Sequence, residues 1–215
     1  MPDAAAATVT DRIRAATREH HQRAEHAEFQ QRLVAGKHGP APYAAWLGQM
    51  RLLHEALERL EQEGVRAAGR TTWPITDAQH RTASIAADLA VIGSESSRVT
   101  PLPAVQAFIA RCEAWAADPA EAWKLLGAWY VLEGATNGGR YIARNVRRGA
   151  GLAGVDGTRY LDPYGEEQPQ RWQAFKEAFN AAVPAAHAET VLDGACATYD
   201  AVTALGEELS AAFPA

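Results

Sequence analysis

The stretch "WYVLEGATNGGRYIARNVRRG", Trp129 to Gly149, reads as a helix except for three glycines near its middle, Gly134, Gly138 and Gly139. Each glycine inside a helix costs about 1 kcal/mol relative to alanine, so the segment gives up about 3 kcal/mol of helix propensity. Two explanations compete. Either the helix ends here in a loop, or a bulky partner lies so close to the backbone that no side chain fits between them.

Helical periodicity dominates on both sides of this segment, and alternating strand-like runs are absent from the sequence. The expected helices cover residues 10–28, 42–63, 77–92, 103–117, a fifth that starts at "DPAEAW" and contains the glycines, 169–182 and 184–212. The stretch "GAGLAGVDGTRYLDPYGEEQP" is rich in glycine, and we expect a loop over one end of the bundle there. The pattern predicts an all-α fold, a single-domain helical bundle over residues 1–215 with residues 1–9 as a flexible N-terminus.

Composition narrows the function classes. The net charge of −5 and pI near 5.8 argue against nucleic acid as the main partner, because phosphate binding favours a basic surface. No signal pattern and no run of about 18 apolar residues occurs, so neither export nor a membrane span is expected. Cys112 and Cys196 lack the spacing of a zinc site or a disulfide scaffold, which predicts reduced thiols in the cytoplasm.

A possible metal ligand lies in the first expected helix, in "RAATREHHQRAEHAEF", residues 14–29. His21 and Glu25 are four residues apart, which places them on one helix face. A neutral imidazole ligates a metal through one nitrogen while a carboxylate orients the other nitrogen. A solvated His–Glu pair is the plainer alternative, and without HExxH or a cysteine set no dedicated zinc or di-iron site is expected.

Together these segments resemble the heme oxygenase family. In that family an alanine–threonine pair precedes the iron-ligating histidine and Ala-Glu follows it, as around His21 here. Glu25 falls on the acidic residue near the ligand, and "GATNGG", Gly134 to Gly139, matches the glycine-rich distal helix. Residues 77–90 and 191–209 are similar to the third and last helices. The resemblance implies a bundle of the heme oxygenase type, with heme between the first helix and a glycine-kinked distal helix.

The resemblance also implies an activity. The family opens heme at a meso carbon, with O2 and electrons from an external donor such as ferredoxin or a flavin reductase, to give biliverdin, CO and ferrous iron. Heme b is then both substrate and cofactor, and His21 is the iron ligand. A non-catalytic heme carrier or sensor on the same fold stays open. A thiaminase-like enzyme is a further alternative, although neither cysteine has a convincing acid/base setting in the sequence.

Heme binding answers the question of the glycines, because Gly134, Gly138 and Gly139 would let the backbone approach the porphyrin. The anionic propionates call for cations. Arg14, seven residues before His21, matches a basic position of the family and is the first candidate. The weaker candidates are Arg140, Arg171 and Lys176.

This sequence departs from the family pattern at Ala135, where many members carry an aspartate that holds a distal water. Asn137 is a candidate replacement, and a helix-surface role is the equal alternative. His54 aligns with a family tyrosine that supports the distal hydrogen-bond network. We therefore expect either that His54 holds the distal water or that it is a core histidine bonded to a backbone carbonyl.

Overall fold

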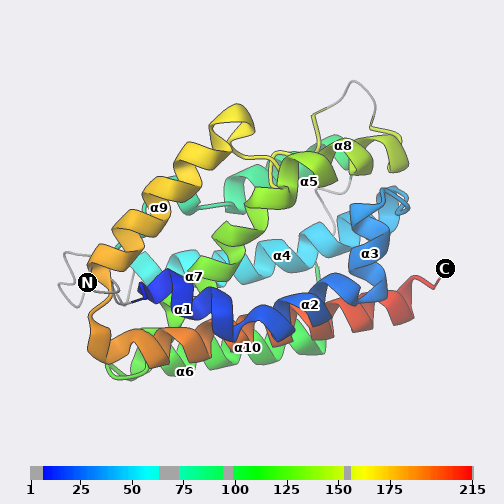
Figure 1. The fold of residues 1–215 in the computed structure, drawn as a ribbon. Helices are drawn as coiled ribbons and strands as arrows, with labels where there is room; N and C mark the ends of the chain where they lie inside the picture. The colour runs from blue at the N-terminus through cyan, green and yellow to red at the C-terminus, as the bar shows by residue number, and fades with distance from the viewer. Residues whose placement is uncertain (1–6, 63–72, 94–98, 153–155, 215) are drawn as a thin grey trace.

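The structure, a computed structural model, describes residues 7–62, 73–93, 99–152 and 156–214 (Figure 1). In chain order the helices are α1 (Val9–Ala16), α2 (Arg18–His26), α3 (Glu28–Val34), α4 (Pro40–Leu60), α5 (Thr82–Ile92), α6 (Pro103–Ala117), α7 (Lys124–Gly134), α8 (Gly139–Gly149), α9 (Gln168–Ala182) and α10 (Ala188–Ala212). Short 3-10 turns are η2 (Asp77–Gln79), η3 (Ala135–Gly138), η4 (Gly165–Glu167) and η5 (Ala185–His187). These described ranges contain no strand, and the predicted all-α fold is confirmed.

The expected first helix, residues 10–28, is instead two helices, α1 and α2, and its last residue begins α3. At Thr17 the side-chain hydroxyl donates to the Ile13 carbonyl at 2.8 Å, a bond that bends helices. At Ala27 the ψ angle of 132° is extended, so the chain turns a corner before α3. Nothing in the local sequence marks that corner, where the Ala27 side chain packs on Gly206 of α10.

The N-terminus also differs from expectation. Residues 1–6 lie outside the described residues, but Val9 is already helical rather than part of a flexible arm. The Thr8 hydroxyl caps α1 by accepting from the Asp11 amide at 3.2 Å, which satisfies one of the free N–H groups at the helix start. No helix in the described ranges combines the length and apolar character that crossing a membrane requires.

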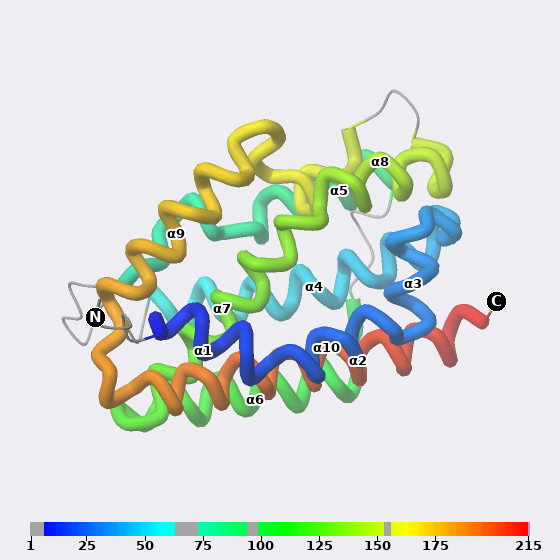
Figure 2. The backbone as a smooth tube through the Cα atoms, in the orientation of Figure 1, coloured from blue at the N-terminus to red at the C-terminus, as the bar shows by residue number. Residues whose placement is uncertain are grey.

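Helix α10 is the platform of the bundle, because α1, α2, α3, α6 and α7 all pack on it. Figure 2 shows α10 running beside α1 and α2 along the lower edge of the molecule. The contact with α7 is a direct backbone contact. A β carbon added at Gly127 would lie 2.1 Å from the Val191 carbonyl oxygen, and one added at Gly194 would lie 2.1 Å from the Lys124 carbonyl oxygen. No larger residue fits at either position.

The largest fully buried side chains come from different helices and meet in one apolar cluster: Trp129, Tyr43, Phe29, Phe108 and Phe179. The connection between α8 and α9 contributes to this core, with Tyr160 and Leu161 both buried. The segment is irregular over most of its described residues, as expected, and it also contributes to the core, which the sequence pattern did not indicate. The apolar side chains within it draw the chain inward, beside α4 and η3.

Because α7 and α10 are in backbone contact, adding a single methyl group between them should lower the free energy of unfolding. Gly194→Ala places a methyl group against the Lys124 carbonyl, and overpacking of this kind costs about 1–3 kcal/mol. We expect a lower free energy of unfolding in urea titrations. Gly206→Ala is the matched control on the same helix, because its β carbon would meet the Ala27 methyl at an ordinary 3.4 Å. A Gly194→Ala protein as stable as Gly206→Ala would contradict the close backbone contact.

Candidate functional site

A cavity of about 270 Å³ is bounded by α2, α3, α4, α10 and the α7–η3–α8 segment. Its wall is mostly apolar and includes Leu33, Val34, Trp46, Met50, Val131, Leu132, Ile142, Leu161 and Val202. Its polar lining residues are His21, Glu25, Gln30, Thr136, Asn137, Tyr160 and Tyr199. An apolar wall with a few polar groups is typical of small-molecule sites. A second, more open depression on the outer side of α2 and α10 contains none of the predicted site residues.

Six of the residues predicted from the sequence line this cavity: His21, Glu25, Gly134, Ala135, Asn137 and Gly138. Six others do not: Gly139, His54, Arg14, Arg140, Arg171 and Lys176. The structure therefore brings the predicted histidine ligand and the glycine turn to one space. It places the predicted cations outside that space.

His21 lines the cavity, and its two ring nitrogens, Nδ1 and Nε2, have different surroundings. Its Nδ1 lies 3.3 Å from Glu25 Oε2, and the ring packs edge-on against Tyr199 at 5.4 Å between centroids. The Nε2 atom has no hydrogen-bond partner among the described residues, and the side chain is 49% exposed. An imidazole oriented at one nitrogen and open at the other is arranged as a metal or heme-iron ligand.

His20 faces away from the cavity. Its Nδ1 lies 2.7 Å from Asp200 Oδ1 of α10 and 2.9 Å from Arg23 Nη2. These contacts tie its ring to the outer surface of the α2–α10 pair. Of the two adjacent histidines, only His21 lines the cavity.

The glycine segment stays in the right-handed helical region throughout, so the alternative that the helix ends in a loop is wrong. The chain instead tightens into the 3-10 turn η3 between α7 and α8. Added β carbons at Gly134 and Gly138 would meet only side-chain atoms, Trp172 at 3.5 Å and Ile142 at 3.7 Å. These two positions line the cavity without a steric demand from the protein itself.

Gly139 is different, and the expectation that it faces the ligand is corrected. A β carbon there would lie 1.6 Å from the Leu161 carbonyl oxygen. The protein's own backbone, from the loop before α9, therefore requires this glycine. Only Gly134 and Gly138 are candidates for close approach to a ligand.

Hydrogen bonds hold the η3 turn from within and from α9. The Thr136 hydroxyl donates to the Glu133 carbonyl at 2.7 Å, and Gln168 Nε2 donates to the Thr136 hydroxyl at 2.8 Å. Asn137 Nδ2 donates to the Gly134 carbonyl at 2.9 Å. Asn137 therefore lines the cavity with its amide nitrogen committed to the turn. Ala135 adds only a methyl group, so the turn presents backbone and small side chains.

A buried ion pair lies behind this turn, and no sequence pattern indicated it. Arg81 Nη2 donates to Glu133 Oε2 at 2.9 Å, and the Tyr164 hydroxyl donates to Glu133 Oε1 at 2.8 Å. Burial raises the pKa of Glu133, while the Arg81 charge and the Tyr164 hydrogen bond lower it. Glu133 immediately precedes Gly134, so the pair anchors the start of the glycine turn to α5.

His54 lies one layer behind the cavity. Its Nε2 is 3.3 Å from the hydroxyl oxygen of Tyr160, a residue that does line the cavity. The expected partner, a backbone carbonyl, is thus replaced by a tyrosine hydroxyl. Its Nδ1 is buried, lies 4.0 Å from Glu58 Oε1 and has no hydrogen-bond partner in the part of the chain that the structure describes.

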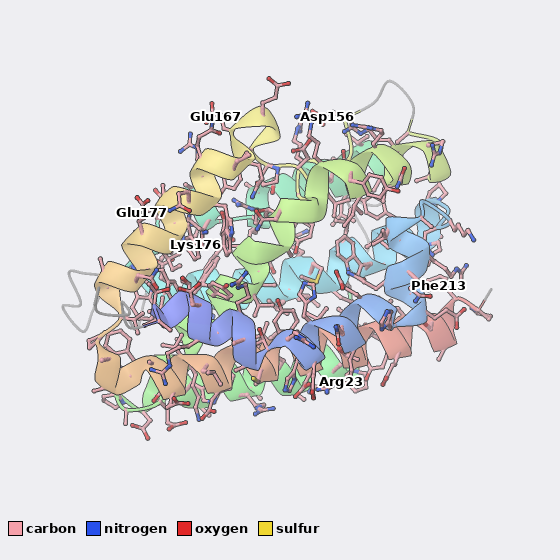
Figure 3. The ribbon with its side chains drawn as sticks, viewed as in Figure 1. Arg23, Asp156, Glu167, Lys176, Glu177 and Phe213 are labelled. Atoms are coloured by element: carbon pink, nitrogen blue, oxygen red, sulfur yellow. The ribbon has the colours of Figure 1, made fainter. Side chains whose placement is uncertain are left out.

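The four candidate cations differ in whether they form ion pairs with carboxylates. Arg140 pairs with Glu166 at 3.2 Å and Arg171 with Glu167 at 2.9 Å, both on the exposed surface. Arg14 and Lys176 have no carboxylate within 4.0 Å among the described residues. Both act on the Asp11 carboxylate, which places them at the junction of α1 and α9. Figure 3 shows Lys176 on α9 at the side toward α1.

The cysteines are not arranged as nucleophiles. Burial in α6 raises the pKa of the Cys112 thiol to about 12. Burial, with Asp200 and Asp193 nearby, also raises the pKa of Cys196. Since the thiolate is the reactive form, these environments disfavour the thiaminase-like alternative.

Sequence reasoning missed Tyr160, Tyr199 and Gln168. Tyr199 continues the row of Val191 and Ala195 at four-residue spacing on α10, and this periodicity was a usable signal. Tyr160 lies within the irregular loop before α9, and Gln168 is the first residue of α9. No periodicity exists there to indicate which side chains point inward.

Alanine substitutions at Gly139 and at Gly138 should change the free energy of unfolding in opposite directions. Gly139→Ala forces the methyl group into the Leu161 carbonyl, and we expect a loss of about 2 kcal/mol or more in the free energy of unfolding. Gly138→Ala has open space and gains up to about 1 kcal/mol of helix propensity. Urea unfolding of both variants without added ligand checks this. Equal stability of the two variants would show that the loop does not press on Gly139.

A second prediction concerns acid stability. Burial, followed by the Arg81 and His80 charges, lowers the pKa of His54 to about 3 from 6.5. Between these pH values the unfolded chain binds the proton and the folded chain does not, so stability falls as pH falls. From pH 7 to 5.5 this group alone costs about 1.3 kcal/mol. In His54→Phe that part of the loss should vanish in urea titrations at both pH values. An unchanged pH dependence would place the ring in contact with water.

Comparisons with known proteins agree with this geometry. The family model described as heme oxygenase matches residues 7–208. The structure of heme oxygenase-2 from Synechocystis in complex with heme and NO matches at a TM-score of 0.84 and 18% identity, covering 96% of this chain and 88% of that one. The Leptospira interrogans heme oxygenase matches at 0.83 and 18%, covering 94% and 100%. Synechocystis heme oxygenase-1 in complex with heme matches at 0.80 and 18%, covering 96% and 94%.

No curated protein matches the chain by sequence. At 18% identity the solved structures show the fold alone. The family match is the stronger finding, because it spans almost the whole chain and both walls of the cavity. The chain belongs to the heme oxygenase family.

Proposed function

We propose that this protein cleaves heme at a meso carbon, using O2 and electrons from an external donor, to give biliverdin, CO and ferrous iron. One observation carries the proposal. Across one mostly apolar cavity, His21, whose Nε2 has no hydrogen-bond partner among the described residues, is paired with a helical turn of glycines and small side chains. This is the family's activity.

The residues present fit a heme. The wall is apolar, as the porphyrin face requires, and β carbons at Gly134 and Gly138 would meet only protein side chains, so the backbone itself forms the surface on that side. Opposite them, the His21 imidazole is partly exposed and oriented at Nδ1. When bound, heme supplies the iron that reacts with O2 and the meso carbon that is attacked.

On the proximal side, His21 holds the iron through Nε2. Glu25 Oε2, 3.3 Å from Nδ1, favours the tautomer with the proton on Nδ1 and leaves Nε2 unprotonated for the metal. Tyr199 packs on the ring edge and limits its rotation. Burial raises the pKa of Tyr199, so its hydroxyl stays neutral beside the ligand.

On the distal side, the η3 turn positions the substrate and places no bulky side chain against it. Gly134 and Gly138 leave space for the porphyrin, while the Thr136–Gln168 hydrogen bond and the Glu133–Arg81 pair hold the turn in place. Such a preorganised site does not need to rearrange during the reaction.

For the propionates we propose Arg14 and Lys176 ahead of Arg140 and Arg171. The first two have no carboxylate within 4.0 Å among the described residues, whereas Glu166 and Glu167 already pair with the other two. Lys176 Nζ lies 5.8 Å from the ring centre of Trp172, and that ring lies 3.5 Å from the position of an added Gly134 β carbon. One side chain, Trp172, therefore connects Lys176 to a residue of the cavity wall.

A hemin titration followed by reduction in air with a reductase or ascorbate tests the function. We expect a Soret band on binding, then its loss with appearance of biliverdin absorbance and CO. In His21→Ala the histidine-ligated spectrum should be lost and should return with added imidazole, because the vacated site accepts the free base. His20→Ala is the matched control and should bind hemin as the parent does. The reverse pattern would assign the iron to His20.

A heme carrier or sensor on the same fold is a second candidate, favoured by one observation. Ala135 lines the cavity where many family members have a carboxylate. Hemin binding without biliverdin formation would establish the carrier, and absence of hemin binding would exclude both functions. A redox partner such as ferredoxin or a flavin reductase, and a cytoplasmic location, belong to the same proposal.

A further inference from the structure

A line of buried polar groups runs from the cavity wall to the surface of α4. Tyr160 lines the cavity, and its hydroxyl is 3.3 Å from His54 Nε2. His54 Nδ1 lies 4.0 Å from Glu58 Oε1, and the Glu58 side chain is 14% exposed. A small shift of either side chain closes that distance to a hydrogen bond. Only three side chains therefore separate the cavity from solvent.

Tyr160 lies on the distal side of the cavity. Its neighbour Leu161 presses its carbonyl oxygen onto Gly139, immediately after the η3 turn. The Tyr160 ring packs on Trp46 at 5.5 Å between centroids and edge-on to His54 at 5.4 Å. Its position is thus set by the same contact that fixes the turn opposite His21.

His54 Nδ1 is buried and has no hydrogen-bond partner among the described residues. A buried nitrogen without a hydrogen bond destabilises the folded protein, and such groups call for an explanation. An apolar side chain would fill the same volume between Trp129 and Tyr160 without that cost. A histidine at this position differs from an apolar side chain in having two ring nitrogens, one that can accept a proton while the other donates one.

We propose that Tyr160, backed by His54 and Glu58, delivers protons to the distal side of the cavity in place of a carboxylate at position 135. Tyr160 is the catalytic residue of this set, and His54 and Glu58 are positioning residues that act through it. The proposal rests on the proposed function, since it names how that reaction obtains its protons.

The proton movement balances, and the net charge of the protein does not change. The Tyr160 hydroxyl gives its proton to the reacting oxygen in the cavity, and the Tyr160 oxygen takes a proton from His54 Nε2. His54 Nδ1 takes a proton that comes from solvent through Glu58, whose carboxylate accepts it and passes it on. Tyr160 and Glu58 end as they began, and His54 ends neutral in its other tautomer, so a proton must return from Nδ1 to Nε2 before the next transfer.

The surroundings suit this role. Burial keeps the His54 imidazole neutral, so one of its two ring nitrogens is free to accept a proton. Burial also raises the pKa of Tyr160, so its hydroxyl keeps a proton to donate to the reacting oxygen. The charged groups around His54 are Glu58 on its own helix and Arg81 and His80 from the segment that begins α5. Glu58 Oε1 is held by the backbone amides of Arg81 at 2.7 Å and Thr82 at 3.0 Å. Its carboxylate is therefore fixed beside Nδ1.

The test uses the full chain loaded with hemin and compares Tyr160→Phe and His54→Phe with Tyr43→Phe. Tyr43 is the matched control, because it is a buried tyrosine that donates to the Gly157 carbonyl at 3.0 Å and does not line the cavity. Each variant loses one buried hydroxyl or imidazole. Only the first two interrupt the proposed path.

We expect hemin affinity within about twofold of the parent for all three variants. Biliverdin formation driven by a reductase should fall about tenfold or more in Tyr160→Phe and His54→Phe and should be unchanged in Tyr43→Phe. With hydrogen peroxide, which brings its own protons and two of the electrons, the first two variants should approach the parent rate. A loss with both oxidants would instead mean a merely structural role and would overturn the proposal.

A second readout does not depend on turnover. The visible spectrum of the hemin complex changes with pH as the group opposite His21 ionises. A hydroxyl that donates to the ionised form lowers that midpoint, so Tyr160→Phe should raise it by about half a pH unit or more, and Tyr43→Phe should not. An unchanged midpoint with unchanged turnover would overturn this inference alone. A parent protein that does not bind hemin would overturn the proposed function with it.

Discussion

The backbone contact between α7 and α10 at Gly127 and Gly194 is the constraint on which the site depends. With no side chain at either glycine, the two helices cross with each backbone against the other. Helix α2, which carries His21, packs on the same α10. The separation between the proposed ligand and the distal turn at the end of α7 is therefore set through one common platform. A larger residue at either glycine moves α7, and the turn moves with it.

The distal turn combines an inner surface of small residues with strong support from behind. Toward the cavity it presents two glycines and three small side chains: Gly134, Ala135, Thr136, Asn137 and Gly138. On its other sides it is held by Gln168 from α9, by Arg81 through Glu133, and by the Leu161 carbonyl against Gly139. The lost helix propensity of the glycines is thus offset by contacts outside the helix. Rigid support matters because a flat ligand gains little from a wall that must be reordered on binding.

The polar groups of the distal side come both from the turn and from behind it. The turn itself contributes Thr136 and Asn137 to the cavity wall, while the Ala135 side chain has no hydrogen-bonding group. Tyr160, from the loop before α9, lines the neighbouring wall, and its hydroxyl lies 3.3 Å from His54 Nε2 of α4 in the layer behind. Three separate segments of the chain therefore place polar groups on this side.

The all-α class and most helix positions followed from the sequence, because the burial of one helix face leaves a 3.6-residue pattern along the chain. The His21–Glu25 pair and the unusual glycines were visible for the same local reason. Helical spacing did not distinguish His21 from His20, and the choice of His21 rested on the family motif; the tertiary structure adds the physical reason, which is the contact of His20 with Asp200. It also assigned Gly139 to the Leu161 carbonyl and brought Tyr160 to His54. These contacts join residues far apart in the chain, and periodicity records which face of a helix is buried but not which distant residue covers it.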